Sequence, residues 1–354
     1  MANIRDVAQL AGVSISSVSN VLNNRIHQMS NDTRIRIEQA IRELNYHPVR
    51  ANRTSEKTKS ERERIIGLLV PSIVNPSFAA LANEVELSAK QYRYRVLLSS
   101  THRQDDEERA FIADMFSHDV RGIIVAASDV RKTHFVAAAE RGMMIVSYDN
   151  RLSERINAEA ALFDSVSMDN VEAGRLAAQH LVDRGCQHIV FVTESSLTLS
   201  RSHKIDGFLT VLRNHRLLGR QPIIEGQASS EYGDSEMIEL GLALATTVLA
   251  MTPRPDGIVA INDALGMGLL LGLRTAGVDV PKDVSVVGID NISMGALARP
   301  SLTSVMPPLA EMAQLMVERL IKRMDDATLK PEEYLFPPSL VCRQSVRAEH
   351  IEQE

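Results

Sequence analysis

The hydrophobic positions at the start of the chain follow the spacing of an amphipathic helix. Apolar side chains recur at i, i+3, i+4 and i+7, namely at Ile4, Val7, Ala8 and Ala11, and this spacing places them on one helix face. Asn3 precedes the run and has the side chain of a helix N-cap. The pattern predicts a first helix from about residue 4.

A second short helix is expected after a turn at Gly12. Glycine can adopt the positive φ of such a turn, and Ser14 is a suitable N-cap for the helix that follows. Val18, Val21 and Leu22 would form its buried face. Two short helices joined by a glycine-containing turn predict a helix-turn-helix, in which the second helix reads DNA. On spacing alone, an ordinary helical hairpin inside a larger core is the alternative.

A third helix completes the expected head. Ser30 is its predicted N-cap and Pro48 closes it, and the buried face is expected to consist of Ile37, Ala40, Ile41 and Leu44. Three helices in residues 1–48 predict a compact DNA-binding head. Residues 49–64 lack apolar periodicity and are rich in Arg, Lys, Glu, Ser and Thr, which indicates a hinge or linker.

Beyond residue 64 the chain changes to short apolar runs that alternate with helical stretches such as Phe78 to Gln91. Continuous apolar runs are typical of strands that are buried on both faces. The expected strands are Ile65 to Val70, Arg95 to Leu98, Gly122 to Ala126, Met143 to Val146, Ile189 to Val192, Ile223 to Ile224, Ile258 to Ile261 and Val284 to Gly288. Alternation of strands and helices predicts parallel sheets covered by helices.

The number of strands predicts an α/β body of two doubly wound lobes, with the seam near Phe163 to Ser167. Ligands of such folds bind outside the carboxyl ends of the strands. We therefore expect polar residues that follow strands to face a cleft shared by the two lobes.

Composition is that of an ordinary globular protein, with 44% hydrophobic and 24% charged residues. No run approaches the ~20 apolar residues that a membrane span requires, and the N-terminus lacks an apolar signal region. These features predict a cytoplasmic protein. Cys186 and Cys342 are too few for a disulfide framework or a thiolate metal site, so both are expected to be buried, reduced thiols.

The net charge of −6 is unevenly distributed along the chain. Through Arg64 there are 11 Lys and Arg against 7 Asp and Glu, whereas the remainder has 28 against 38. A basic head on an acidic body is the distribution expected if the head alone contacts DNA. A chance asymmetry of a solvated surface is the alternative.

Several stretches together closely resemble the lactose-repressor/galactose-repressor family of bacterial transcription regulators. In the order and spacing of that family they read IRDVAQLAGVSISSVSNVLN, NYHP, GLLVPSIVNPSF, MDNVEAG, INDALGMG, DVSVVGIDN, SLTSV and LVCRQS. The resemblance implies a homodimer or tetramer that binds a pseudo-palindromic operator, and a periplasmic-binding-protein-like body that takes a small effector. The body, residues 65–354, is then expected to comprise lobe 1 at about 65–164 and 292–325, and lobe 2 at about 165–291 and 326–354.

The resemblance implies base contacts by Ile15, Ser16 and Asn20, phosphate contacts by Ser14, Ser17 and Asn24, and hinge contacts by Arg50, Asn52, Arg53 and Ser55. Asn20 can present its amide to adenine, and Ile15 can contact a thymine methyl unless it packs against its own head. The family usually has Arg at position 20 and Leu at position 55, where Leu forms a minor-groove wedge. The hinge then binds without a strong kink, or Arg50 and Arg53 enter a narrow groove, or operator bending is weak.

For the effector, the resemblance implies contacts by Asn75, Phe78, Asp149, Lys204, Asn262, Asp263 and Asp290. Carboxylates and amides over an apolar wall suit hydroxyl-rich ligands, so a sugar or sugar phosphate is the first expectation. A purine, another metabolite or no effector stay open. Lys204 replaces the usual Arg and lacks its bidentate fork, and Pro307 replaces a common Gln. As the alternative, Asn262 and Asp290 only cap helices.

An enzyme and a transport-associated binding protein are the rival functions. The sequence contains no phosphate-binding glycine loop, metal-spaced Cys/His pair or nucleophile elbow, so neither an enzyme nor a cofactor is expected. His180 and His188 are expected to be structural. The basic head and the missing export signal argue against a transport protein. Repression rather than activation is expected on family grounds only.

Overall fold

The computed structural model describes residues 4–22, 30–44, 64–149, 162–195, 198–227 and 236–348. The chain divides into two units, Met1–Arg62 and Glu63–Glu354, and each is described by itself. Within the described ranges, no helix is long and apolar enough to cross a membrane.

The N-terminal unit contains three described helices around a small core. These are α1 (Ile4–Ala11), α2 (Ile15–Leu22) and α3 (Asn31–Glu43). Each helix contributes a fully buried side chain to one cluster, Val7 from α1, Val18 from α2 and Ile37 from α3. Because all three helices bury their apolar stripes against one another, the predicted three-helix head is confirmed.

The turn between α1 and α2 depends on Gly12, whose φ is +66°. A side chain would be strained in this conformation, whereas glycine adopts it readily. Ser14 then caps α2, since its Oγ accepts a hydrogen bond from the Ser17 amide at 3.2 Å. Ser30 caps α3 in the same way, through the Thr33 amide at 3.4 Å. The predicted turn and the predicted caps of α2 and α3 are confirmed. Asn3, the predicted cap of the first helix, and Pro48, the residue predicted to close the third, lie outside the described residues.

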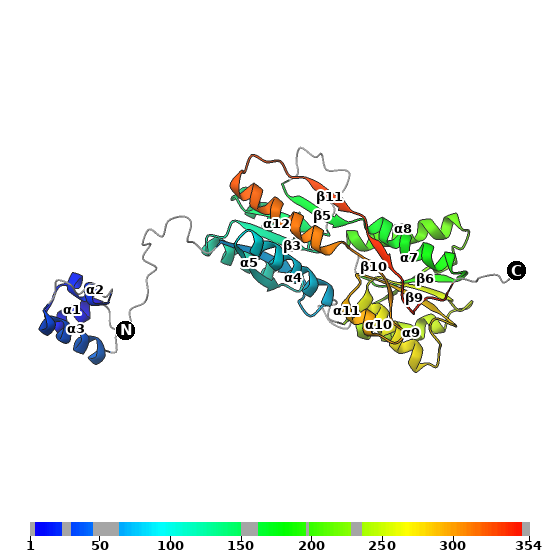
Figure 1. Ribbon diagram of the computed structural model, residues 1–354, viewed down its shortest axis with the longest axis horizontal. Helices are drawn as coiled ribbons and strands as arrows, with labels where there is room; N and C mark the ends of the chain where they lie inside the picture. The colour runs from blue at the N-terminus through cyan, green and yellow to red at the C-terminus, as the bar shows by residue number, and fades with distance from the viewer. Residues whose placement is uncertain are drawn as a thin grey trace. The chain divides into compact units, whose positions relative to one another are not determined.

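The larger unit contains two six-stranded sheets, each at the centre of one lobe (Figure 1). Lobe 1 contains β1 (Arg64–Val70), β2 (Tyr94–Ser100), β3 (Gly122–Ala126), β4 (Met144–Tyr148), β5 (Asp164–Met168) and β11 (Glu333–Phe336). Lobe 2 contains β6 (Ile189–Glu194), β7 (Ile223–Gly226), β8 (Gly257–Ala260), β9 (Ser285–Ile289), β10 (Thr303–Met306) and β12 (Ser339–Val341). All eight predicted strands are present.

The strand orders are β11-β5-β4-β3-β1-β2 and β12-β10-β9-β8-β6-β7. All pairings are parallel except that of β10 with β12. In each lobe the first strand pairs with the second on one side and the third on the other, which is a doubly wound order. The predicted fold class is confirmed. The order reverses beside β1 and β6, where ligands of such folds bind.

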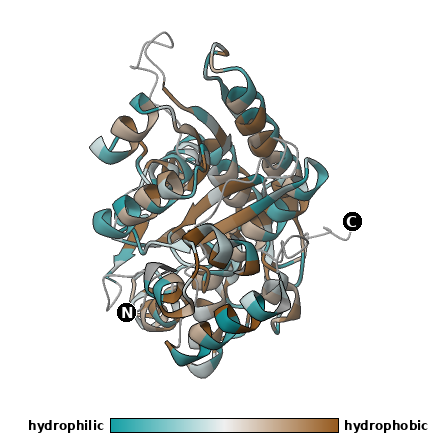
Figure 2. Ribbon diagram, turned by 90° about the vertical axis from the view of Figure 1, so that its left-hand side faces the viewer, coloured by the Kyte–Doolittle hydropathy of each residue, from teal (hydrophilic) through white to brown (hydrophobic). Residues whose placement is uncertain are grey.

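Helices lie on both faces of each sheet, and Figure 2 shows that the strands are mostly hydrophobic whereas the helices carry hydrophilic stretches. In lobe 1, α4 (Pro76–Gln91) packs beside α12 (Leu309–Asp325) on one face, and α5 (Asp105–Ser117) and α6 (Thr133–Glu140) lie on the other. In lobe 2, α7 (Asn170–Asp183) packs with α8 (Leu199–Asn214), and α9 (Met237–Leu249) with α10 (Asp263–Thr275). The short α11 (Ser293–Leu297) follows β9.

The chain crosses between lobes after β5, after β10 and after β11, and this differs from the lobe boundaries expected above. Residues 164–168 and 333–336 belong to the lobe 1 sheet, and residues 303–306 belong to the lobe 2 sheet. The physical reason is that β11 pairs with β5 and β10 pairs with β9, so each sheet is completed by strands from the far end of the chain.

A buried ion network fixes the last strands of lobe 1. The Asp164 carboxylate is fully buried and accepts hydrogen bonds from Arg319 Nε at 2.9 Å and Arg323 Nη1 at 2.8 Å, both on α12. It also accepts from the backbone amide of Glu332, just before β11, at 3.1 Å. One side chain therefore joins β5, α12 and the start of β11.

The prediction that both cysteines are buried is wrong for one of them. Cys186 is buried, and burial raises the pKa of its thiol to about 11. Cys342 is exposed, because it follows β12, which lies at the edge of the lobe 2 sheet.

Candidate functional site

The outward face of α2 carries the predicted base-reading side chains. Ser16 and Asn20 are exposed, and Ile15 is 45% exposed. Ile15 is not part of the apolar cluster that holds the head together, so its side chain is available to a partner. A polar and branched surface on a short, well-capped helix has the shape and chemistry of a major-groove reader.

Ser14 and Ser17 lie at the N-terminus of α2 and hydrogen bond to each other through their hydroxyls at 3.0 Å. They hold the start of the reading helix, where its positive dipole end also favours a phosphate. The other five residues expected to contact DNA lie outside the described residues. They are Asn24, Arg50, Asn52, Arg53 and Ser55.

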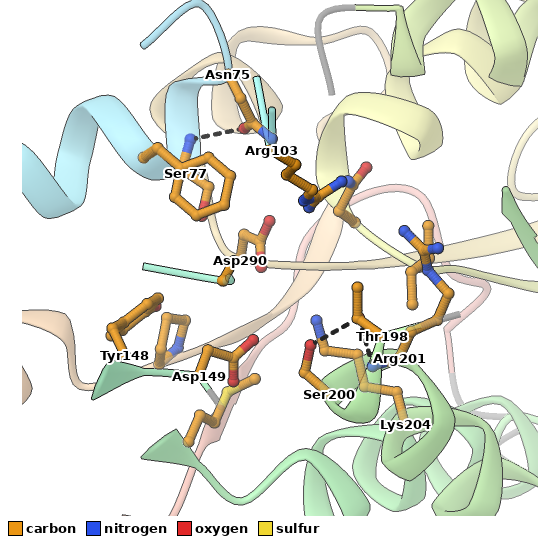
Figure 3. A pocket seen from close by; sticks show the side chains of 16 residues that line it. Asn75, Ser77, Arg103, Tyr148, Asp149, Thr198, Ser200, Arg201, Lys204 and Asp290 are labelled. Atoms are coloured by element: carbon orange, nitrogen blue, oxygen red, sulfur yellow. Dashed lines mark hydrogen bonds between the residues drawn. The ribbon is translucent and has the colours of Figure 1, made fainter. Parts of the chain in front are cut away.

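A cavity between the two lobes brings together most of the predicted effector contacts (Figure 3). Six of the seven line it, namely Asn75, Phe78, Asp149, Lys204, Asn262 and Asp290. Four follow strands β1, β4, β8 and β9 directly or within a short loop. The carboxyl ends of strands from both sheets therefore converge on one site, as expected for this fold.

Two of the lining amides are positioned as helix caps. The Asn75 Oδ1 accepts from the Ser77 amide at 3.0 Å and caps α4, and the Asn262 Oδ1 accepts from the Leu265 amide at 2.9 Å and caps α10. Capping leaves the NH2 group of each side chain as a donor for a ligand. Asn262 therefore both caps α10 and lines the cavity. Asp290 caps no helix, because the N-cap of α11 is Ile292.

Several lining residues adopt positive φ angles. Asp149 follows β4 with a φ of 56°, and Asp290 follows β9 with a φ of 110°. Ala127 after β3 and Arg103 after β2 have φ angles of 52° and 58°. Such angles are costly for residues other than glycine and concentrate at ligand sites. They turn the chain sharply at the strand ends, so that side chains of both lobes face the cavity.

Asp149 is a half-buried carboxyl group of the cavity wall. Burial raises its pKa, and the nearby Lys204 charge opposes that shift. Asn170 Nδ2 donates to Asp149 Oδ1 at 2.6 Å, and Ser200 also hydrogen bonds to the carboxyl group. Burial raises the pKa of the neighbouring Tyr148 well above its usual value, so its phenol remains protonated. Together they offer both donors and acceptors to ligand hydroxyls.

Lys204 is positioned by an unusually close contact between α7 and α8. A side chain at Gly174 would collide with the carbonyl oxygen of Lys204, and one at Gly207 would collide with that of Val171. Because both positions are glycine, the two helix backbones touch. Lys204 is consequently only 8% exposed, although its side chain lines the cavity.

Asp263 is the one predicted effector contact that does not line the cavity. It is fully buried, and its carboxyl oxygens accept from Ser304 Oγ at 2.6 Å and from the Ile292 amide at 2.8 Å. Successive residues of a helix point about 100° apart, so the residue after the capping Asn262 faces the interior. Asp263 connects α10 to the segment that follows Asp290.

Asp263 should also make stability depend on pH. Burial and the nearby Asp290 charge raise its pKa from 3.8 to about 8. Between these values the folded protein holds a proton that the unfolded chain has lost, so the free energy of unfolding falls as pH rises. In Asp263→Asn the fall between about pH 5 and pH 8 should be smaller by at least ~1.4 kcal/mol, the equivalent of one pKa unit. Urea unfolding at several pH values measures this.

Asp326→Asn is the matched control for this measurement. Asp326 hydrogen bonds to Thr328, which lowers its pKa, so it titrates below the range in question. The control should retain the wild-type slope. Identical slopes for Asp263→Asn and the wild type would contradict the assigned protonation state.

The sequence did not single out several residues that line the cavity. They are Ser77, Arg103, Ala127, Tyr148, Met168, Thr198, Ser200, Arg201 and Ile261. Arg103 follows β2 and Thr198 follows β6, so the rule that ligands bind beyond strand ends would have found both. Arg201 forms a buried ion pair with Glu194. Among the described residues, no group of three His, Cys, Asp or Glu side chains is arranged to hold a metal ion.

Comparisons with known proteins match both units. Residues 3–49 match the family of bacterial regulatory proteins of the lacI type, and residues 178–346 match the periplasmic binding protein-like domain. The chain is 30% identical to a ribose operon repressor of Halalkalibacterium halodurans over 347 residues, which cover 98% of each chain. It is 28% identical to the transcriptional repressor PurR of Vibrio cholerae over 349 residues, again 98% of each.

A solved structure of a lacI-family regulator has the same fold as the body. The lacI-family transcriptional regulator from Enterococcus faecium with bound ribose aligns with a TM-score of 0.69 and 26% identity, over 80% of this chain and 98% of that one. Family models, relatives aligned over almost the whole chain and the fold thus agree with one another. The chain belongs to the lacI family of bacterial regulatory proteins, DNA-binding repressors that are not enzymes and that carry a periplasmic-binding-protein-like effector domain.

Proposed function

We propose that this protein represses an operon for carbohydrate use, and that a carbohydrate binding between the two lobes controls its affinity for the operator. The observation that carries the proposal is the cavity, which is lined by Asp149, Asp290 and Asn262 together with the aromatic ring of Phe78. Carboxylate and amide groups over an aromatic ring suit a ring with several hydroxyls. The similarity to a ribose operon repressor and to a ribose-bound regulator supports this choice.

A purine is the second candidate effector. The chain is 28% identical to a PurR repressor, and the rings of Phe78 and Tyr148 both line the cavity. Aromatic rings stack with planar bases. Isothermal titration with D-ribose, cellobiose, hypoxanthine and guanine separates the two classes, because a purine site should bind the bases and ignore the sugars.

We expect the protein to act as a homodimer. One α2 helix presents few side chains to DNA, so a single head can read only a short half-site. Two heads related by twofold symmetry would read an inverted repeat. An effector that contacts both lobes changes operator affinity if it binds two arrangements of the body unequally.

Selection of bound sequences from a random duplex pool tests the DNA-binding part of this proposal. The full-length protein is used at two salt concentrations, because phosphate contacts make non-specific binding salt-sensitive. The expected result is an inverted repeat whose half-sites are recovered at both concentrations. Recovery of no motif, with all binding lost at the higher salt, would mean that the head binds DNA without reading sequence.

A further inference from the structure

The effector cavity continues into a second compartment at the edge of the interlobe cleft. Five residues line both compartments, namely Arg103, Ala127, Asp149, Thr198 and Ser200. The second compartment has a volume of about 390 Å³ and is otherwise lined by Ser128, Asp129, Arg131, Lys132, Leu199 and Ser202. The combined lining contains five cationic side chains and three carboxyl groups. A ligand of the main cavity can therefore extend into a region with an excess of positive charge.

Arg131, Lys132 and Arg201 each already hold a carboxylate. Arg131 contacts both oxygens of Asp129 at 2.8 and 2.9 Å, Lys132 pairs with Glu108 at 3.0 Å, and Arg201 pairs with Glu194. These pairs fix the lining, but they leave little charge for a ligand.

Lys204 differs from these three cations. It is more than nine-tenths buried and lines the cavity, and Figure 3 shows its side chain extending from α8 into the site. Within the described ranges no carboxylate lies within ion-pair distance of its ammonium group. Asp149 interacts with the Lys204 charge, but its hydrogen bonds are to Asn170 and Ser200. An ammonium group that lines a cavity and has no ion pair can bind the charge of an anionic ligand.

The start of α8 adds a second attraction for an anion at the same place. Thr198 caps this 16-residue helix, since its Oγ1 accepts from the Arg201 amide at 3.3 Å. Leu199 and Ser200, in the first turn, line the second compartment. The first amides of a helix point outward and carry its positive dipole end. Lys204 lies one turn further along the same helix.

We propose that the effector is an acidic carbohydrate whose phosphate or carboxylate group is bound in the main compartment, on the side of the second, by Lys204, Arg103 and the N-terminus of α8. The inference rests on the proposed carbohydrate effector and specifies its chemical class. The sugar ring lies in the main compartment against Phe78, and its hydroxyls contact Asp290 and Asn262. The acid group of the ligand provides the negative counter-charge that Lys204 lacks.

Isothermal titration of the full-length protein tests this inference. The probes are D-ribose, D-ribose 5-phosphate, D-ribonate, D-glucose, D-glucose 6-phosphate, D-gluconate and inorganic phosphate. At least one acidic derivative should bind tenfold or more tightly than its neutral parent, the gain expected from one charge-assisted hydrogen bond. The phosphate and carboxylate probes distinguish the two sources of the anion.

Variants of Lys204 show whether this residue holds the anion. Lys204→Met removes the charge at similar size and should abolish the preference for the acid, whereas Lys204→Arg should retain it. A thermal melt checks that both variants are folded. Arg131→Gln should weaken acid binding mildly, and the control is Arg121→Gln, since Arg121 forms a similar exposed pair with Asp119 outside the cavity.

The inference fails if neutral sugars bind more tightly than their acids. It also fails if Lys204→Met weakens the binding of the neutral sugar and of the acid equally, because a ligand held only through its hydroxyls would behave in this way. It also fails if no probe, inorganic phosphate included, shows binding that depends on Lys204. Recovery of an inverted repeat in the duplex selection would leave the DNA-binding function intact in each case. Failure of that selection would instead count against the proposed function itself.

Discussion

Replacing Asp164 by alanine should lower the free energy of unfolding by about 3–5 kcal/mol, the usual cost of removing one partner from a buried ion pair. The carboxylate is fully buried and binds both Arg319 and Arg323, which are 8% and 7% exposed. Without it, two guanidinium groups stay buried with no full counter-charge. The backbone amide of Glu332 also loses its acceptor. Urea unfolding monitored by circular dichroism measures the change.

Asp106→Ala provides the matched control, because it breaks an ion pair of the same chemistry at the surface. Asp106 is 96% exposed and contacts Arg109 at 2.8 Å. Exposed pairs contribute about 0–1 kcal/mol, so this variant should unfold almost as the wild type does. If the two variants are destabilised equally, the network does not hold the end of the lobe 1 sheet together.

Replacing Asn20 by alanine should weaken operator binding by about 1–3 kcal/mol, the value of one good bidentate base contact. Asn20 is exposed on the outer face of α2, so its loss removes no contact from the head core. Binding to random DNA depends on phosphate contacts and should stay unchanged. Fluorescence anisotropy with the selected operator and with a scrambled duplex measures both affinities.

The control for Asn20 is Gln39→Ala, an exposed amide on α3 of the same head. It should leave both affinities as they are. Equal losses on operator and scrambled DNA for Asn20→Ala would mean that this side chain positions the head on the backbone and reads no base.

The sequence predicted eight strands from their apolar residues and missed β5, β10, β11 and β12. The eight predicted strands are rich in Ile, Leu and Val. In contrast, β5 reads DSVSM and is nonetheless buried at every position, because its Asp164 is neutralised by two arginines of α12. A buried strand of this kind cannot be recognised from its own hydropathy, since its partners lie 155 and 159 residues away.

The lobe crossings escaped prediction for a related reason. Both β10 and β12 are short, and β10 begins with Thr303 and Ser304, which are fully buried. Ser304 bonds to Asp263, and the Thr303 amide donates to Ser345 Oγ at 2.8 Å. Such pairs are set by tertiary structure, so local pattern does not indicate them.

The site was predictable to the extent that strand ends determine it. Asn75, Asp149, Asn262 and Asp290 follow strands that the pattern had identified. Asp263 was wrongly predicted to line the cavity. Consecutive residues at the start of α10 point in different directions, so that Asn262 lines the cavity and Asp263 faces the interior. The burial of Lys204 was not predictable, since it depends on glycines at positions 174 and 207 that let two helices touch.

The affinity of the full-length protein for its selected operator, measured with and without the tightest-binding acidic sugar, tests the central claim most directly. If the interlobe cavity controls DNA binding, a saturating ligand should change the operator Kd at least tenfold, a coupling of about 1.4 kcal/mol. Lys204→Met should lose this response and keep its operator affinity. A ligand that binds the cavity and leaves the operator Kd unchanged would contradict the account.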